Sequence, residues 1–209
     1  MKPGQSQLES ARAARQEELD LIRARLGALH PRESVVFGEG NPLASLVLVG
    51  EAPGAEEAAA GRPFVGAAGR LLTRLLSQVS LSREDLWITN LVKERPTRTE
   101  GGRVLNRPPT SLEVKTDLPI LISELRAIQP RAVVSLGSQP ANNLIHRDFR
   151  MLEEHGRWFA HPLGFQVMAT FHPAYVFRHR GPARDRLEEA LRRDLASAKE
   201  VAEATGGPA

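Results

Sequence analysis

Residues 45–66 constrain the fold of this chain more than any other stretch. They begin with Leu46-Val-Leu-Val-Gly50, a short apolar run before a turn, which predicts a buried strand. They end at Gly66, after which an apolar segment with helical spacing begins. Glycines, prolines and glutamates fill the interval. Open α/β sheets bind ligands between the carboxyl end of a strand and the next helix, so this stretch is a candidate ligand site.

Further predicted strands and helices alternate along the rest of the chain. Apolar runs predict strands at residues 86–92, 131–137, 158–160 and 165–170, and a short strand at 35–37. Capped or amphipathic segments between them predict helices, including a closing helix over residues 182–203. The alternation predicts an α/β fold, a three-layer α/β/α sandwich with a central, mainly parallel four-stranded sheet.

The length of 209 residues is typical of one domain. We expect a single domain over residues 8–203, with tails at 1–7 and 204–209. Within the domain, residues 8–29 carry apolar side chains near helical spacing and predict an N-terminal amphipathic helix. The His30-Pro31 pair ends that helix, because the residue before a proline is disfavoured in the helical conformation.

Composition excludes several kinds of site. The sequence has no cysteine, which rules out disulfides, thiolate zinc sites and cysteine nucleophiles. The six histidines show no paired spacing typical of metal ligands, and no serine-hydrolase elbow is present, so no metal site is expected. No apolar run is long enough to span a bilayer, and the N-terminus lacks a signal-peptide core. We therefore expect no membrane association and a cytoplasmic location.

Arginines cluster within residues 95–107 and 178–184, although the net charge is only +3. Such clusters suit phosphate contacts, but charge runs more often lie on solvated surface. Residues 93–110 are polar and rich in proline, which predicts a long irregular loop of functional interest. A helix is expected from about residue 111 to Ile128, interrupted near Pro119.

Three predicted strands end in residues able to carry chemistry: Gly50-Glu51, Asn90 and His172. Parallel strands end at one edge of a sheet, so these residues should converge there, with Phe64 nearby. Each could instead have a purely structural role. Gly50-Glu51 could be only a turn, Asn90 a cap, His172 a buried structural histidine and Phe64 a core aromatic. His161, which also precedes a proline, lies at a predicted hairpin turn, and we expect it to be inert.

Motifs along the chain closely resemble the uracil-DNA glycosylase superfamily, most of all its family 4 branch. The resemblance runs over residues 35–200 in unbroken order and rests on Gly50-Glu-Ala-Pro-Gly54, Gly61-Arg-Pro-Phe-Val-Gly66, Ile88-Thr-Asn90-Leu-Val-Lys93, Leu136-Gly137 and Phe171-His-Pro-Ala-Tyr175. It implies that the chain is a monofunctional glycosylase that flips uracil out of DNA and hydrolyses its N-glycosidic bond. Uracil-containing DNA would be its partner and the chain a monomer. No repair-protein partner can be named.

The resemblance assigns the pocket residues. Phe64 would stack on the flipped uracil, and Asn90 would read its polar edge. His172 would donate a hydrogen bond to uracil O2 as negative charge develops on the base. Backbone N–H groups of the turn would act as an oxyanion hole for the same charge; the turn comprises Gly50, Glu51, Ala52, Pro53 and Gly54.

The resemblance leaves the water-positioning group open. The efficient branch of the superfamily has an aspartate where Ala52 stands, and alanine cannot orient water. Glu51 is the first candidate for that role and Glu57 the second. The efficient branch also has a tyrosine at position 54 that blocks the thymine methyl group, and Gly54 cannot do so.

The segment after His172 resembles the wedge loop of the family. Val176, with Phe177 as its neighbour, would enter the gap left by the flipped nucleotide. We expect at least one side chain among Tyr175, Val176 and Phe177 to be buried instead. Arg178, His179 and Arg180 would hold phosphates, and the arginine cluster that begins at Arg95 would contribute to DNA binding.

Family 4 enzymes typically carry an iron–sulfur cluster on four cysteines, which this chain lacks. Their positions correspond to Arg23, Leu26, Glu94 and either Lys115 or Thr116. We therefore expect no cofactor and infer that packing of the N-terminal helix replaces the cluster. A related branch traps the sugar covalently through a histidine after the second strand, and residues 95–107 contain no histidine.

Two alternatives to uracil excision stay open. One is a glycosylase for another deaminated base, hypoxanthine or xanthine. The other is a non-catalytic protein that binds DNA damage on the same scaffold.

Overall fold

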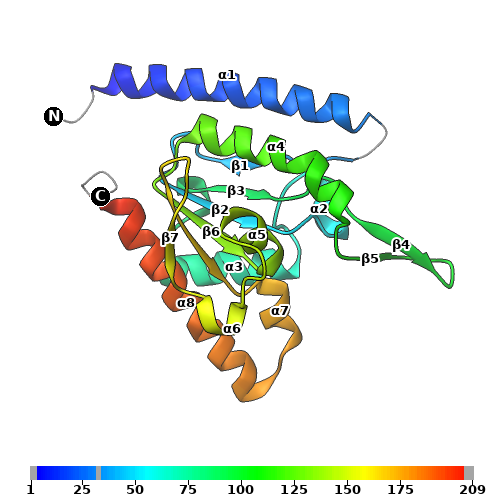
Figure 1. Ribbon diagram of the computed structural model, residues 1–209. Helices are drawn as coiled ribbons and strands as arrows, with labels where there is room; N and C mark the ends of the chain where they lie inside the picture. Colours follow the sequence, from blue (N-terminus) through cyan, green and yellow to red (C-terminus); the bar gives the residue numbers. More distant parts are fainter. Residues whose placement is uncertain (1–3, 32–33, 205–209) are drawn as a thin grey trace.

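The computed structural model describes residues 4–31 and 34–204. The strands are β1 (Glu39–Gly40), β2 (Leu46–Gly50), β3 (Trp87–Asn90), β4 (Thr97–Glu100), β5 (Arg103–Asn106), β6 (Ala132–Leu136), β7 (Trp158–Ala160) and β8 (Gln166–Thr170). The helices are α1 (Gln5–Leu29), α2 (Ala55–Ala60), α3 (Ala67–Gln78), α4 (Ser111–Ile128), α5 (Ser138–Leu144), α6 (Met151–Glu154), α7 (Pro173–Arg178) and α8 (Gly181–Glu203), with a 3-10 turn at Arg83–Asp85. Figure 1 shows their arrangement.

The main sheet has six strands in the order β1-β3-β2-β6-β8-β7. Its four central strands, β3, β2, β6 and β8, are parallel, which confirms the predicted core of the fold. The two edge strands are antiparallel additions to the predicted four. β7 and β8 form the expected hairpin. β1, however, lies at Glu39–Gly40, and residues 35–37, predicted as a short strand, form none.

Helices cover both faces of the sheet, which makes the fold the expected three-layer sandwich (Figure 1). Along β2, Val47 and Val49 pack in one hydrophobic cluster with residues of α1 and α4. Leu46 and Leu48 pack in a second cluster with residues of α3 and α8. Successive side chains of a strand point to opposite faces, so a continuous apolar run is required where both faces are covered.

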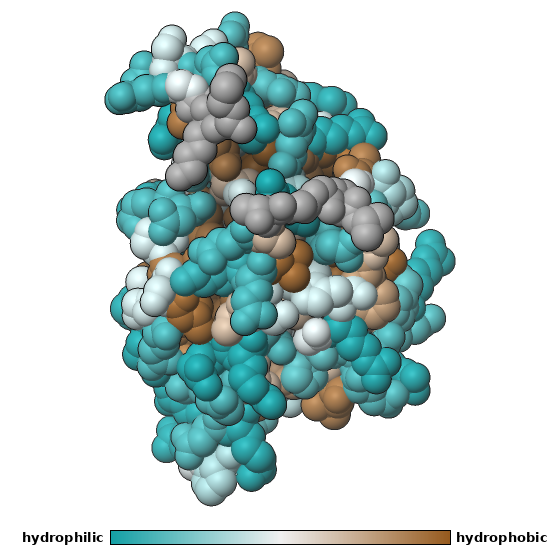
Figure 2. Space-filling view, turned by 90° about the vertical axis from the view of Figure 1, so that its left-hand side faces the viewer, coloured by the Kyte–Doolittle hydropathy of each residue, from teal (hydrophilic) through white to brown (hydrophobic). Residues whose placement is uncertain are grey.

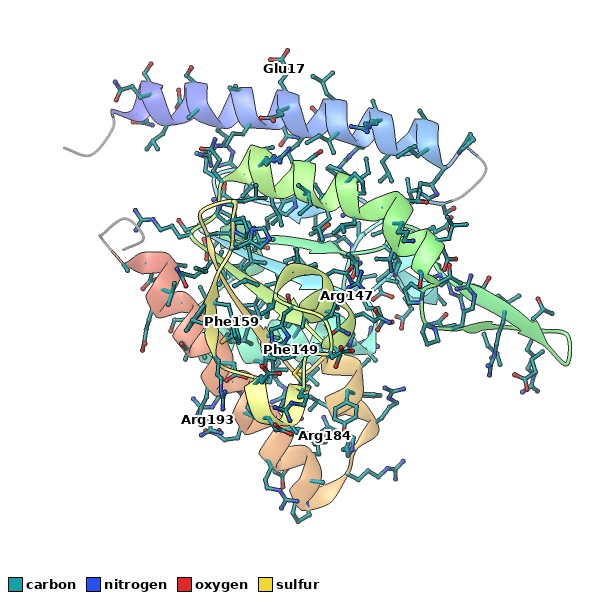
Figure 3. The ribbon with its side chains drawn as sticks, in the orientation of Figure 1. Glu17, Arg147, Phe149, Phe159, Arg184 and Arg193 are labelled. Atoms are coloured by element: carbon teal, nitrogen blue, oxygen red, sulfur yellow. The ribbon has the colours of Figure 1, made fainter. Side chains whose placement is uncertain are left out.

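Helix α1 lies along α4 at the edge of one layer (Figure 1). Its side chains Leu19, Ile22 and Leu26 are buried, whereas Glu17 points away from the protein in Figure 3. The helix begins at Gln5, inside the segment predicted as a tail. The other predicted tail residues, 1–3 and 205–209, lie outside the described residues. The single-domain boundaries stay a prediction.

Three segments differ from the local predictions. Helix α4 continues through Pro119 without interruption. The predicted irregular loop contains a hairpin of β4 and β5 that extends away from the sheet (Figure 1). The segment after Phe171, which was expected to be a wedge loop, is the short helix α7, with His172 as its N-cap and Pro173 in its first turn. Proline is favoured at that helical position because its missing N–H would be unpaired there in any case.

A buried ion network ties α1 and α4 to the end of β3. Lys93 is fully buried and its Nζ donates to Thr89 Oγ1 at 2.7 Å and to Glu124 Oε1 at 2.9 Å. The Lys93 N–H donates to Asp117 Oδ2 at 2.6 Å. The other Asp117 oxygen contacts His30 Nε2 at 2.7 Å. We call His30, Lys93, Asp117 and Glu124, with Thr89 and Glu94, the buried ion network.

The outer surface carries no broad apolar face on the side drawn in Figure 2. That view, which faces the left of Figure 1, is mainly hydrophilic with small separate apolar patches. Inside the fold, Phe149 and Phe159 pack edge to face with ring centroids 6.2 Å apart, and they point toward one another in Figure 3. No helix in the described part of the chain is long and apolar enough to cross a membrane.

Candidate active site

A pocket of about 640 Å³ opens at the carboxyl edge of the parallel strands. The turn after β2, the end of β3 and the start of α7 line it. The base of the β4–β5 hairpin also lines it, through Pro96, Asn106 and the Arg107-Pro-Pro segment. Glu51, Phe64, Asn90 and His172 all line this pocket, although they come from distant parts of the sequence.

Gly50 lets Asn90 and Phe64 approach the strand end closely. It lies directly beside Asn90 in the register of β2 and β3. A Cβ atom at position 50 would overlap the Asn90 amide oxygen and the Phe64 ring. Glycine is therefore required here for close approach of side chains, not for its backbone angles.

Phe64 is held in an uncommon backbone conformation, with φ of 53°. Arg83 stabilises it, because its guanidinium donates to the carbonyls of Phe64 at 2.9 Å and Pro63 at 2.8 Å. The Phe64 ring lies 5.7 Å from the His172 ring between centroids, at an interplanar angle of 30°. The two rings are thereby stacked at the pocket lining, where Phe64 is 6% exposed.

The Asn90 amide lines the pocket without a hydrogen-bond partner in the described part of the protein. Although the residue is only 2% exposed, its amide atoms are not among the fully buried unpaired atoms, so they stay open to the pocket. A ligand with a matching donor and acceptor could therefore bond the amide without displacing a protein partner.

His172 is held as a neutral donor. Its Nδ1 accepts the Ala174 N–H at 3.0 Å, so the neutral ring carries its proton on Nε2. Burial, with the charge of Arg178 as a smaller cause, lowers the pKa of His172 to about 4. The imidazole is therefore uncharged at neutral pH and offers one N–H.

The turn after β2 offers fewer backbone donors than its glycines suggest. Pro53 has no N–H, and the Gly54 N–H already donates to Glu57 Oε2 at 3.2 Å. The carbonyls of Gly50 and Glu51 accept the N–H groups of Leu91 and Val92. The N–H groups of Glu51 and Ala52 are left without a partner among the described residues.

The two candidate carboxylates differ in their partners. Glu57 Oε1 accepts the Gly66 N–H at 2.9 Å while its Oε2 accepts the Gly54 N–H, so the side chain ties the two ends of the loop together. Glu51 makes no hydrogen bond to a described residue. Burial raises the pKa of Glu51, and the positive charge of Arg178 opposes that rise.

Of the three α7 side chains considered for the wedge, two are exposed and one is buried. Tyr175 and Phe177 are 40% and 49% exposed and line the pocket. Val176 is fully buried between them, in the core against α3 and α8 residues, so it cannot enter DNA in this conformation and that expectation is corrected. One buried side chain of the three was expected. Arg178 also lines the pocket and is exposed.

Two residues singled out in the sequence, Arg95 and His161, lie outside the pocket, and some residues that line it were not predicted. Arg95 does not line the pocket; its Nε donates to Asn106 Oδ1 at 2.7 Å. Asn106 and Arg107 do line it and were missed, although the proline-rich loop was singled out. His161 lies outside the pocket and stacks on Phe165 with centroids 4.2 Å apart.

The residues at the expected cluster positions do not fit an iron–sulfur cluster. The sequence has no thiolate to bind one, and the described residues contain no group of side chains able to hold a metal ion. Leu26 is buried and Glu94 contacts His30 at 3.2 Å. Arg23 lies over the Phe37 ring, as does Lys93 of the buried ion network. Packing and ion pairs therefore occupy this region.

Comparisons with known proteins agree with this geometry. The family model described as the uracil DNA glycosylase superfamily matches residues 37–196. The type-4 uracil-DNA glycosylase of Pyrobaculum aerophilum is 42% identical over 154 residues, covering 70% of this chain and 75% of the relative. The type-4 enzyme of Thermotoga maritima is 37% identical over 169 residues, covering 80% and 83%. That of Saccharolobus solfataricus is 37% identical over 170 residues, covering 78% and 75%.

Proposed function

Because the chain belongs to the uracil-DNA glycosylase superfamily, we propose that it excises uracil from DNA by hydrolysis of the N-glycosidic bond. The products are free uracil and an abasic site. The observation that carries the proposal is the unpaired amide of Asn90, open to a pocket that the Phe64 ring and the neutral His172 also line.

Base recognition rests on Phe64 and Asn90. The flipped base stacks on the Phe64 ring, which lies in the same pocket as the Asn90 amide. The amide nitrogen donates to uracil O4 and the amide oxygen accepts from N3–H. Cytosine reverses both groups and would leave the amide mismatched, so it is rejected.

Departure of the base rests on His172 and the turn after β2. As the bond from C1′ to N1 breaks, the electron pair moves onto the base, and negative charge gathers on O2. The Nε2–H of neutral His172 donates to that oxygen, as do the N–H groups of Glu51 and Ala52 where the base lies within their reach. Preorganised donors of this kind stabilise charge that develops in the transition state.

The water step is assigned to Glu51. Its carboxylate faces the pocket without a protein partner, whereas both oxygens of Glu57 hold backbone N–H groups. Glu51 stabilises the positive sugar and takes a proton from the water that attacks C1′. Glu57 instead positions the loop.

The remaining parts of the proposal concern the oligomeric state, the DNA contacts outside the pocket, the cofactor and the location. Action as a monomer stays a prediction. DNA phosphates meet Arg178, and Tyr175 and Phe177 fill the gap left by the flipped nucleotide. That the reaction needs no cofactor, and the cytoplasmic location, stay predictions.

The test uses labelled oligonucleotides with one uracil, hypoxanthine, xanthine or thymine, in single-stranded and duplex form, followed by alkaline cleavage at abasic sites. Uracil substrates should be cut and cytosine controls should not. Cleavage only at hypoxanthine or xanthine would favour a different base, and binding without any cleavage would favour a non-catalytic damage-binding protein.

A further inference from the structure

The proposed chemistry does not use the β4–β5 hairpin. Every residue of its two strands is exposed, and its side chains stand clear of the rest of the protein (Figure 3). Only its base joins the pocket, through Pro96 and Asn106. An isolated two-stranded hairpin is at best marginally stable in water. A partner that covers it would supply the missing contacts.

The hairpin is nevertheless well defined. Gly101 and Gly102 have φ values of 55° and 75° at its tip. Positive φ at both central residues is typical of a type I′ turn, whose twist matches that of the flanking strands. The register pairs Glu100 with Arg103 and Thr97 with Asn106. The hairpin therefore projects beside the pocket as a defined two-stranded ribbon.

Positive charge is concentrated in this segment. Residues 95–107 contain four arginines and one glutamate, a net charge of +3 that equals the charge of the whole chain. Arg98 pairs with Glu100 at 3.0 Å, whereas Arg103 makes no ion pair among the described residues. Arg107 pairs with Glu113 at 2.6 Å, and residues 97–106 alone carry two arginines and one glutamate, so the ribbon itself has a net charge of +1.

The chemistry of the ribbon favours duplex DNA over a single strand. The alternation of side chains puts Arg98, Glu100, Arg103 and Leu105 on one face. Neither strand contains an aromatic residue, and single strands are held chiefly by aromatic stacking together with charge. The major groove of B-DNA, by contrast, is about 12 Å wide and admits a two-stranded β-ribbon.

We propose that the β4–β5 hairpin grips duplex DNA beside the extruded nucleotide, with Arg98 and Arg103 on its phosphates. This inference rests on the proposed function, since it takes DNA as the substrate. It gives the chain a preference for double-stranded over single-stranded substrate that the pocket alone does not supply.

The test measures KM and kcat of the full chain on matched single-stranded and duplex oligonucleotides with one uracil. The double variant Arg98→Ala/Arg103→Ala should raise KM on duplex by about 10–30-fold at 150 mM salt, because each lost phosphate contact removes close to one unit of salt slope. KM on the single strand should change less than about twofold, and kcat should hold on both substrates. Arg12→Ala/Arg25→Ala, at two exposed arginines of α1 that make no ion pair among the described residues, removes the same charge outside the pocket lining.

A variant that should strengthen duplex binding controls for the possibility that the arginine variant only misfolds the hairpin. Glu100→Gln removes the only negative charge of residues 95–107 and frees Arg98, so it should tighten duplex binding about threefold. Equal losses on both substrates, no loss at all, or the same loss in the α1 control would each overturn the proposal.

Binding measured separately keeps the two proposals distinguishable. Fluorescence anisotropy of labelled duplex, without uracil, reports the hairpin contact even if the chain releases no base. Weaker duplex binding by the arginine variant with no uracil release by the wild type would contradict the proposed function and leave the hairpin contact standing.

Discussion

Two groups of polar side chains flank the end of β3, and they differ in whether their atoms are paired. In the pocket, Asn90 and Glu51 make no hydrogen bond to a described residue. Three residues after Asn90, Lys93 bonds Thr89 and Glu124 through its ammonium group, and its N–H bonds Asp117. Both groups are buried or half-buried, so burial alone does not distinguish a binding site from a structural one.

The two groups are distinguished by hydrogen bonding, because the pocket side chains Asn90 and Glu51 lack partners among the described residues and the network side chains bond one another. The unpaired polar atoms of Asn90 and Glu51 are open to the pocket, where a ligand with complementary groups can bond them. Paired ions offset their loss of hydration through one another and hold elements in place. In the buried ion network, one Glu124 oxygen is the exception, since it is buried without a hydrogen-bond partner.

The two groups are also connected. The residues after Asn90 bond the carbonyls of Gly50 and Glu51, and Lys93 then enters the buried ion network. His30 brings the end of α1 into contact with Asp117 and Glu94. The network therefore holds the strand end from which Asn90 reaches into the pocket.

The largest expected effect is on stability. Lys93→Met leaves the Glu124 carboxylate buried without its cation and should lower the free energy of unfolding by about 3–5 kcal/mol. Urea denaturation would measure the loss, with Lys115→Met, an exposed lysine of α4, as the control. Lys93→Met/Glu124→Leu should recover most of it, because an apolar pair can replace a buried ion pair. Without recovery, the network would not be a simple ion pair.

The next effect is on catalysis. His172→Ala and Asn90→Ala should each slow uracil release by about 10²–10³-fold, because each removes a donor that acts in the transition state or in base recognition. Stability should hold or rise slightly, in contrast to the network variants. His161→Ala, which alters the other histidine that precedes a proline, should leave the rate unchanged. An unfolding free energy that fell with the rate would remove the distinction between the two groups.

The smallest effect concerns pH. Burial alone would lower the pKa of His30, but Asp117, with Glu94, raises it above its ordinary value of 6.5. A raised pKa adds stability that is complete below pH 6.5 and is lost as the pH rises through the folded-state value. Wild-type stability should therefore fall between pH 6 and pH 9 more than that of His30→Gln, as followed by denaturation midpoints. Parallel curves would show that His30 is not charged in the network.

Much of the fold was predictable because it is local in origin. Runs such as Leu46–Gly50 are apolar at every position, which only a strand covered on both faces requires. The motifs around Gly50, Asn90 and His172 likewise indicated one pocket, since parallel strands end at one edge. The hairpin was missed because its strands are polar and exposed on both faces, so no hydrophobic periodicity marks them.

The sequence by itself determined the sheet, the two helical layers and the residues that meet at the carboxyl edge, because apolar periodicity and turn residues act within a few positions. Tertiary structure alone decided how those residues are used. It buried Val176, bonded Glu57 to two backbone N–H groups, and paired Lys93 with a glutamate in α4. Each outcome depends on which groups come into contact across the fold, and a polar side chain's role follows from the partners it finds there.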